Sequence, residues 1–503
     1  MLLLLRSQPC KLGLLLLLLL GVAQRWDVVF GSHGAVLRAR AESMTEVKNV
    51  KPFEVSAVDD DGKDLEKEGI RILDPKPDDG GSATILSSVV NLANVIMGVG
   101  ILALPLAFSE AGWILGTITM ILTAALGILS LHLLGESARL VGAKTFYAVC
   151  EAAIPKFGIV IDVAVVVNSF LVCTSYLIVA TDSFERISSS APEIRDVWTT
   201  MSAILTLPLV LLRRQDALKF TSFLAVIVLV FIALLSIIFS TARRDDPVLS
   251  PCPNSTSDGA CNGAEISPAR GDPLAFVRAF LTFVSAFKCQ QNLLPIASEL
   301  ARPTTARILI VASASIGLAL VLYLVVAFAG YFTFGSFVVG DLLEAYPATS
   351  SVINVARFGI AIVVLTSFPL SSFAMRSSMR SLLSLCSCAR NTCGAGVDDS
   401  YRVGCAPPKV TESFVFEPLP CTVSIGFVTL TLIMAMLVTD LGFMVEIGGA
   451  IVGNLIMLIA PGLCYARLTW NETPRRPLTY VAFVIAIFGA IMVPLGITVS
   501  FLK

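Results

Sequence analysis

The sequence predicts an all-α polytopic membrane protein with eleven transmembrane helices. Of its 503 residues, 55% are hydrophobic and only 15% are charged, whereas a soluble globular chain carries about 25% charged residues. The apolar residues also gather into long runs, several of which contain glycine or proline. The formal net charge of −1 provides no general attraction to a polyanion, which excludes a nucleic-acid partner.

Each predicted span is an apolar run long enough, or nearly so, to cross a bilayer core of about 30 Å, which takes roughly 20 helical residues. The fourth run is the shortest. The predicted spans are 84–108, 113–135, 159–181, 197–212, 220–240, 272–296, 307–332, 350–373, 421–439, 443–463 and 480–500.

The distribution of lysine and arginine predicts the orientation. With the start of the first span in the cytoplasm, the inside loops hold sixteen of these residues and the outside segments hold six. Cytoplasmic loops carry the excess of positive charge, so we expect the amino end in the cytosol.

The outside loop at about 241–271 is consistent with that orientation. It contains the glycosylation acceptor Asn254-Ser255-Thr256. Cys252 and Cys261 lie in the same loop, where an oxidising compartment would allow them to pair; the alternative is two free thiols.

The first 83 residues conflict with the charge count. Residues 1–23 read as a signal-like or targeting segment, with a short apolar run after Arg6 and Lys11. A cleaved signal would place the tail in the lumen; a start at Met44 or an organelle-targeting peptide would resolve the conflict. Residues 24–83 carry 13 acidic against 9 basic residues and predict a disordered acidic tail. The membrane domain is expected over 84–500.

Few residues suit enzymatic chemistry. The two histidines are His33 and His132, and no Walker A sequence is present. Histidine-rich metal sites are therefore excluded, and we expect neither an enzyme nor a bound cofactor.

The first span contains three helix breakers, Gly98, Gly100 and Pro105. Glycine costs about 1 kcal/mol and proline about 3 kcal/mol in a helix interior, so we expect the span to unwind locally. The free N–H groups of one half-helix attract a carboxylate, and the free carbonyls of the other coordinate a cation. Asn91 and Asn94 precede the break and could add amide oxygens. The alternative is a glycine surface for close helix packing.

The sixth span carries a second irregularity, in which Lys288, Gln290, Gln291 and Asn292 form a polar cluster before Pro295. Spans one and six occupy corresponding positions if two five-helix halves repeat with inverted topology and span eleven is an addition. Interrupted helices at corresponding positions indicate a transport site.

The eighth span places two hydroxyls, Thr366 and Ser367, just before Pro369. In an inverted repeat this span packs against the first, where the hydroxyls would help to bind a hard cation. The alternative is that each hydroxyl bonds a backbone carbonyl one turn earlier.

These strings resemble the amino acid/auxin permease family, and within it the sodium-coupled neutral amino acid transporter branch. The resemblance rests on NLANVIMGVGILALP in span one, FKCQQNLLPIASEL in span six and PLSSFAMRSSMRSLL in span eight, and it runs from about residue 82 to 500. It implies a LeuT-type fold, alternating access, and amino acid transport driven by Na⁺ or H⁺.

Carried over to this chain, the resemblance makes the backbone of Gly98, Val99, Gly100 and Ile101 the site of the substrate carboxylate. It makes Asn91 or Asn94, together with Thr366 or Ser367, the sodium contacts. It also implies a bridge between Cys252 and Cys261.

Two residues depart from the family pattern. Gln290 stands where histidine is usual, and Lys288 where a small or apolar residue is usual. An ammonium at that depth would replace a coupling cation or pair with an acidic substrate, unless it snorkels or meets a carboxylate. We expect Lys288, Gln290 and Asn292 to contribute to the substrate site. Arg278 and Arg357 lie nearer span ends and are expected to snorkel.

The sequence therefore predicts a secondary transporter of small neutral amino acids, coupled to Na⁺ or H⁺. A single chain embedded in lipid is expected to form the transport unit, in the plasma membrane or in an endolysosomal or vacuolar membrane. An amino acid sensor with little flux and a transporter of amines are the alternatives.

Overall fold

The computed structural model describes residues 81, 83–188, 194–211, 219–241, 265–392, 418–471 and 476–502. Within them the protein is helical, apart from one isolated bridge between Ala83 and Leu300. The signal-like segment 1–23, Met44 and the acidic tail up to residue 80 lie outside the described residues. So do Cys252, Cys261 and the acceptor Asn254.

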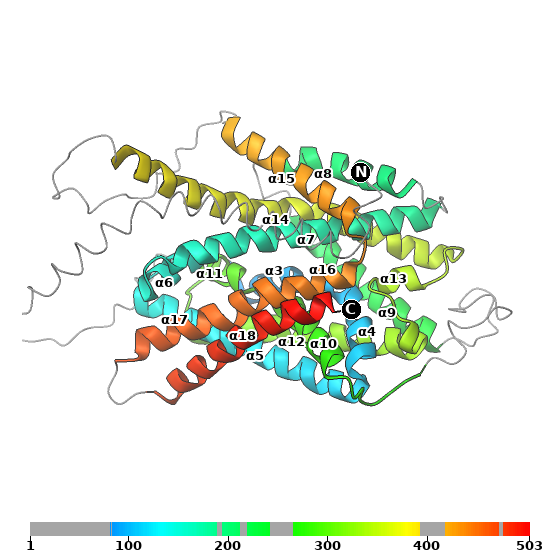
Figure 1. Ribbon diagram of the computed structural model, residues 1–503, viewed down its shortest axis with the longest axis horizontal. Coiled ribbons are helices and arrows are strands. Elements are labelled where there is room, and N and C mark those ends of the chain that lie inside the picture. Colours follow the sequence, from blue (N-terminus) through cyan, green and yellow to red (C-terminus); the bar gives the residue numbers. More distant parts are fainter. Residues whose placement is uncertain are drawn as a thin grey trace, which may run out of the picture. The chain divides into compact units, whose positions relative to one another are not determined.

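A helix or a pair of helices stands at each predicted span, and the first and sixth predicted spans are each divided between two helices (Figure 1). In chain order the elements are α3 (Ile85–Ile96) with α4 (Gly100–Ala111), α5 (Trp113–Val141), α7 (Phe157–Ser188), α8 (Arg195–Leu211), α9 (Lys219–Thr241), α10 (Pro273–Phe287) with α11 (Gln290–Glu299), α12 (Thr305–Phe334), α14 (Ser351–Thr392), α15 (Pro418–Leu437), α16 (Leu441–Gly448) continuing through a π-helix (Gly449–Ile459) into α17 (Ala460–Thr469), and α18 (Pro477–Phe501).

Two short helices lie in connections for which the sequence predicted no helix. Helix α6 (Phe146–Ala153) follows α5, and α13 (Leu342–Ala345) lies between α12 and α14. Thr145 and Asp341 cap them, since each side chain accepts a hydrogen bond from a backbone N–H of the first turn.

Not every predicted span is long and apolar enough by itself to cross a bilayer. Among the described residues seven helices are, and eight spans result if the bent pair α3–α4 counts as one. Helix α8 has 17 residues, and α10 and α11 have 15 and 10. The protein is therefore an integral membrane protein, while the count of eleven stays a prediction.

Helices α12 and α7 each pack against several of the other described helices. Helix α12 contacts α3, α4, α5 and α9, and α7 runs along α14 with α8 and α15 beside it (Figure 1). Large apolar side chains such as Phe223 and Val484 are exposed, as expected for helix faces that meet lipid. Both broken spans lie inside this arrangement, because α4 packs on α10 and α3 packs on α11.

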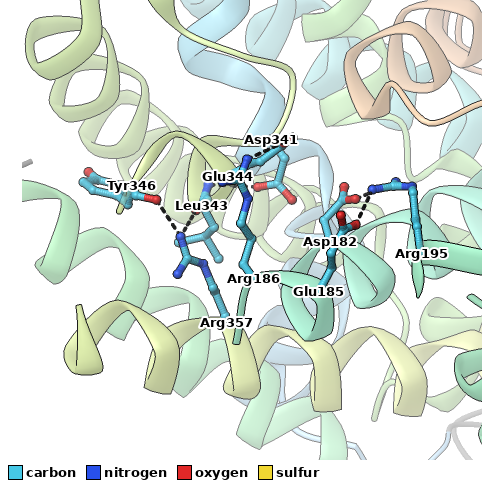
Figure 2. A network of polar contacts seen from close by, with 9 residues as sticks. All are labelled: Asp182, Glu185, Arg186, Arg195, Asp341, Leu343, Glu344, Tyr346 and Arg357. Carbon is cyan, nitrogen blue, oxygen red and sulfur yellow. Dashed lines mark hydrogen bonds and ion pairs between the residues drawn. The ribbon is translucent and has the colours of Figure 1, made fainter. Parts of the chain in front are cut away.

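The arginines near span ends do not snorkel, which corrects that expectation. Arg357 is only 1% exposed, and its guanidinium donates to the carbonyls of Leu343 (2.9 Å), Tyr346 (2.7 Å) and Pro347 (3.3 Å) and to Asn354 Oδ1 (2.6 Å). It thereby fixes the connection around α13 to α14 (Figure 2).

A charged network lies beside Arg357. Arg195 pairs with Asp182 (2.6 Å) and Glu185 (2.9 Å), and Arg186 pairs with Glu344 (2.9 Å), so that α7 is joined to α8 and α13 (Figure 2). Elsewhere, Arg278 Nε of α10 lies 2.8 Å from Glu110 Oε1 of α4. These buried or half-buried arginines stay inside because each meets an acceptor there.

Candidate functional site

The predicted break in the first span is confirmed. Helix α3 ends at Ile96, α4 begins at Gly100, and the two axes differ by 59°. The last bonds on the α3 side run from Met97 N to Ala93 O and from Gly98 N to Ile96 O, both 2.8 Å.

The break leaves amides free on the α4 side. Val99 and Gly100 donate no backbone hydrogen bond among the described residues, and no side chain caps α4. These N–H groups stand at the positive end of the α4 dipole, which attracts a negatively charged group.

The sixth span is also broken, at the start of the polar cluster that precedes Pro295. Helix α10 ends at Phe287, Lys288 and Cys289 leave the helical conformation, and α11 begins at Gln290. Pro295 lies inside α11 as its sixth residue, just as Pro105 is the sixth residue of α4. In both broken spans the proline therefore lies inside the second half-helix, after the break.

One tyrosine joins the two breaks. Tyr323 of α12 is fully buried, and its hydroxyl lies 2.6 Å from the carbonyl oxygen of Ile96 and 3.2 Å from that of Ala286. The hydroxyl proton satisfies one carbonyl at a time, so the end of α3 and the end of α10 meet at a single donor.

A cavity of about 120 Å³ lies between the breaks. Seven of the predicted site residues line it, together with residues of α7, α10, α14 and α16. The predicted residues on its wall are Asn94, Gly98, Val99, Gly100, Lys288, Asn292 and Ser367.

The other predicted residues do not line this cavity. Gln290 is fully buried, and its Oε1 accepts a hydrogen bond from the backbone N–H of Cys289 at 3.0 Å. The Thr366 hydroxyl donates to the carbonyls of Ile362 (2.9 Å) and Val363 (3.0 Å). Asn91 is half-buried and Ile101 is fully buried.

Helix α7 supplies a wall that the sequence reasoning missed. Asn168, Leu171, Val172, Ser175 and Tyr176 line the cavity. Asn168 and Ser175 are seven residues apart and so share one face of the helix, a spacing that the sequence shows. Ser371 of α14 joins this wall and follows Ser367 by one turn.

The cavity wall contains a polar group with an unsatisfied hydrogen-bond acceptor. Asn168 Nδ2 lies 3.4 Å from Gln291 Oε1, while Asn168 Oδ1 is buried without a hydrogen-bond partner. A buried acceptor without a partner is costly, so this oxygen keeps the capacity to accept one hydrogen bond.

The π-helix of span ten positions the opposite wall. Gly449 lies against α10 so closely that a β-carbon there would collide with the carbonyl of Leu281. Met444 and Val445 of α16 line the cavity just before it. π-Helical backbone is rare, and the composition of this segment gave no indication of it.

Comparison with known proteins gives one family match and several relatives. The family described as transmembrane amino acid transporter protein matches residues 81–502. The chain is 26% identical to vacuolar amino acid transporter 5 of Schizosaccharomyces pombe, covering 84% of this chain and 96% of that protein. It is 26% identical to vacuolar amino acid transporter 6 of Saccharomyces cerevisiae, over 82% and 97% of the two chains.

A mammalian relative and a solved structure also match. The chain is 25% identical to sodium-coupled neutral amino acid transporter 7 of Mus musculus, over 84% of this chain and 87% of that protein. The crystal structure of MhsT in complex with L-phenylalanine aligns with a TM-score of 0.48 and 12% identity, over 82% of this chain and 99% of that one.

Proposed function

Since this chain belongs to the family of transmembrane amino acid transporter proteins, we propose that it is a secondary transporter of small neutral amino acids that works by alternating access. One observation carries the mechanism: two spans are interrupted at the same cavity, with free amides at one break. Irregular backbone at membrane depth requires a protein-lined or wet cavity, and paired breaks of this kind bind transported solutes.

The backbone of Val99 and Gly100 would bind the substrate carboxylate. Their amides are unused, they lie on the cavity wall, and they stand at the N-terminus of α4. The substrate ammonium would donate to Asn168 Oδ1, the buried acceptor without a partner. The zwitterion common to amino acids would thus meet a donor set from α4 and an acceptor from α7 in one cavity.

The coupling ion would bind near Asn94 and Ser367. Amide, hydroxyl and carbonyl oxygens are neutral hard ligands of the kind that a cation such as Na⁺ takes. Both residues line the cavity, whereas Asn91 and Thr366 remain candidates whose side chains the structure places off its wall. One relative is named as sodium-coupled; H⁺ is the alternative coupling ion.

The relatives and the charge bias support a proposal for the membrane and the orientation. The two yeast relatives are named as vacuolar, which favours an endolysosomal or vacuolar membrane over the plasma membrane. The amino end would be cytosolic, because the inside loops carry the excess of lysine and arginine. A single chain would form the transport unit, since the cavity is built within one chain.

Amines are disfavoured as substrates by the composition of the cavity wall. Its lining residues include one lysine and no aspartate or glutamate. A positively charged amine would therefore meet a like charge and no counter-ion. An amino acid sensor with little flux is the remaining alternative.

Proteoliposomes containing the full chain test the proposal. We expect accumulation of at least one neutral amino acid when a Na⁺ or H⁺ gradient is imposed, and loss of that accumulation when the gradient is collapsed. Binding without flux would identify a sensor. An absence of both binding and flux across a full amino acid panel, under both gradients, would refute the proposal.

A further inference from the structure

Lys288 is the residue of the second break that the family resemblance does not explain. Along α10 and α11, Ser285, Lys288, Gln291 and Asn292 are partly accessible, whereas Cys289 and Gln290 between them are buried. The same four accessible residues line the cavity. Lys288 therefore lies on the side of the broken span that faces the cavity.

Lys288 has no carboxylate partner among the described residues. Its Nζ lies 3.2 Å from Ser285 Oγ, and the ion pairs of the described chain do not include it. Arg278 in the same half-helix contrasts with it, because that guanidinium pairs with Glu110 at 2.8 Å. The Ser285 hydroxyl accepts a hydrogen bond from the ammonium but does not neutralise its charge.

The ammonium and the free amides of α4 have different neighbours. A β-carbon built on Gly100 would lie 3.7 Å from Ala286, whereas one built on Gly448 would lie 3.3 Å from Lys288 Nζ. Lys288 thus reaches toward α16, and Gly100 faces α10. The cavity lining thus includes two groups suited to negative charge, the amides at the start of α4 and the Lys288 ammonium.

We propose that Lys288 binds a second carboxylate, on the side chain of the transported amino acid, so that the cavity accepts acidic amino acids. This inference rests on the proposed function and extends its substrate class. The α-carboxylate would take the amides of Val99 and Gly100, and the side-chain carboxylate would take Lys288 and Ser285. Amino acids with cationic side chains would be excluded by the like charge.

The chemistry favours an anion at this position. A charge-assisted hydrogen bond between an ammonium and a carboxylate is roughly twice as strong as a neutral one. An ammonium held away from bulk water without a counter-ion is costly. An acidic side chain would remove that cost on binding, and glutamine, its neutral isostere, would not.

Binding of L-glutamate, L-aspartate, L-glutamine and L-arginine to the purified full-length protein tests the inference. We expect the acidic amino acids to bind about tenfold or more tightly than glutamine, and arginine not to bind. In Lys288→Met, the ratio of glutamate to glutamine affinity should fall by about tenfold, and Lys288→Arg should restore it. Lys144, an exposed lysine in the α5–α6 connection, provides the matched control: Lys144→Met should leave the ratio as it is.

The outcomes separate this inference from the proposed function. Binding of glutamine without glutamate would overturn the inference and leave the transporter intact, whereas binding of no amino acid would refute the proposed function itself. An equal loss of both ligands in a folded Lys288→Met protein would make the lysine structural and overturn the inference. If that variant does not fold, Gly448→Ala decides, because its methyl group crowds Lys288 Nζ: a selective loss of glutamate supports the inference, and an unchanged ratio overturns it.

Discussion

The hydroxyl of Tyr323 lies 2.6 Å from the carbonyl oxygen of Ile96, the last residue of α3. That carbonyl also accepts from Gly98 N at 2.8 Å. The carbonyl side of the first break is therefore held in place, while the amide side, at Val99 and Gly100, is left open to the cavity. The asymmetry fits a site that binds a carboxylate through a prearranged backbone.

Tyr323→Phe should loosen both breaks, since the same hydroxyl also lies 3.2 Å from the carbonyl of Ala286. Losing one buried hydroxyl donor typically costs about 1 to 3 kcal/mol. We expect a lower thermal unfolding temperature and weaker substrate binding, measured on the purified protein. Tyr480→Phe, at an exposed tyrosine, is the control and should change neither property.

Gly98→Val should abolish transport while the protein still inserts. A β-carbon at Gly98 would lie 3.8 Å from the Tyr176 hydroxyl across the cavity wall, so the larger side chain would occupy substrate space. Uptake and membrane insertion are measured together. Gly317→Val places its β-carbon in open space on α12 and should retain uptake; retained uptake in Gly98→Val would remove this backbone from the site.

Ser367→Ala should weaken the cation dependence of transport more than Thr366→Ala. Ser367 lines the cavity, whereas the Thr366 hydroxyl is bonded to the carbonyls of Ile362 and Val363. The measurement is the cation concentration that gives half-maximal uptake. The reverse order of effects would show that Thr366 turns toward the ion during transport.

Gly449→Ala should destabilise the protein. The added methyl group would meet the backbone of Leu281, which cannot move aside as a side chain can. Overpacking of this kind typically costs about 1 to 3 kcal/mol, and thermal unfolding in detergent measures it. Gly426→Ala, with nothing near its β-carbon, should be neutral or slightly stabilising.

The structure predicts that stability falls as pH rises toward neutrality, through Asp341 in the α12–α14 connection. Burial raises the pKa of this carboxyl from 3.8 to about 7, and Glu344 adds to the shift, while the Leu343 N–H and Arg357 oppose it. The folded state then holds a proton that the unfolded state releases above about pH 4, so the contribution is complete below that pH and is lost through pH 7. For each pH unit between these two values, the free energy of unfolding falls by about 1.4 kcal/mol at most.

Asp341→Asn tests this dependence, because asparagine keeps the oxygen that accepts from Leu343 N at 2.9 Å. We expect the variant to show a flatter stability profile between about pH 4 and pH 7 than the parent protein. Thermal unfolding at a series of pH values measures it. Parallel profiles would show that Asp341 does not titrate in this range.

The sequence indicated the position of both breaks, because each lies at residues that are unusual in an apolar helix. Gly98 and Gly100 lie at the unwound residues because glycine is a poor helix former. The polar cluster before Pro295 begins at Lys288, where α10 has ended, and Pro295 itself is the sixth residue of α11. The residue at which α11 restarts was not predictable, because no local pattern distinguishes Cys289 from Gln290.

The cavity itself was only half predictable. Polar residues next to helix breakers were found, whereas Asn168 and Ser175 sit on an unbroken helix, where polarity alone does not distinguish a cavity wall from a packed interface. Gln290 and Gln291 illustrate the limit: one is buried against its own backbone and the other lines the cavity. Which of two adjacent residues faces the cavity depends on the exact residue at which α11 begins.

The bridge at Ala83 and the ion pair at Glu110 stand at opposite ends of the two broken spans. Ala83 exchanges backbone hydrogen bonds with Glu299 and Ala301 at 2.9 and 3.0 Å, and Glu110 holds Arg278 at 2.8 Å. Each link ties segments on the same side of the breaks, so α3 is joined to α11 and α4 to α10. The two broken spans are therefore coupled half by half, and each half has its own attachment outside the cavity.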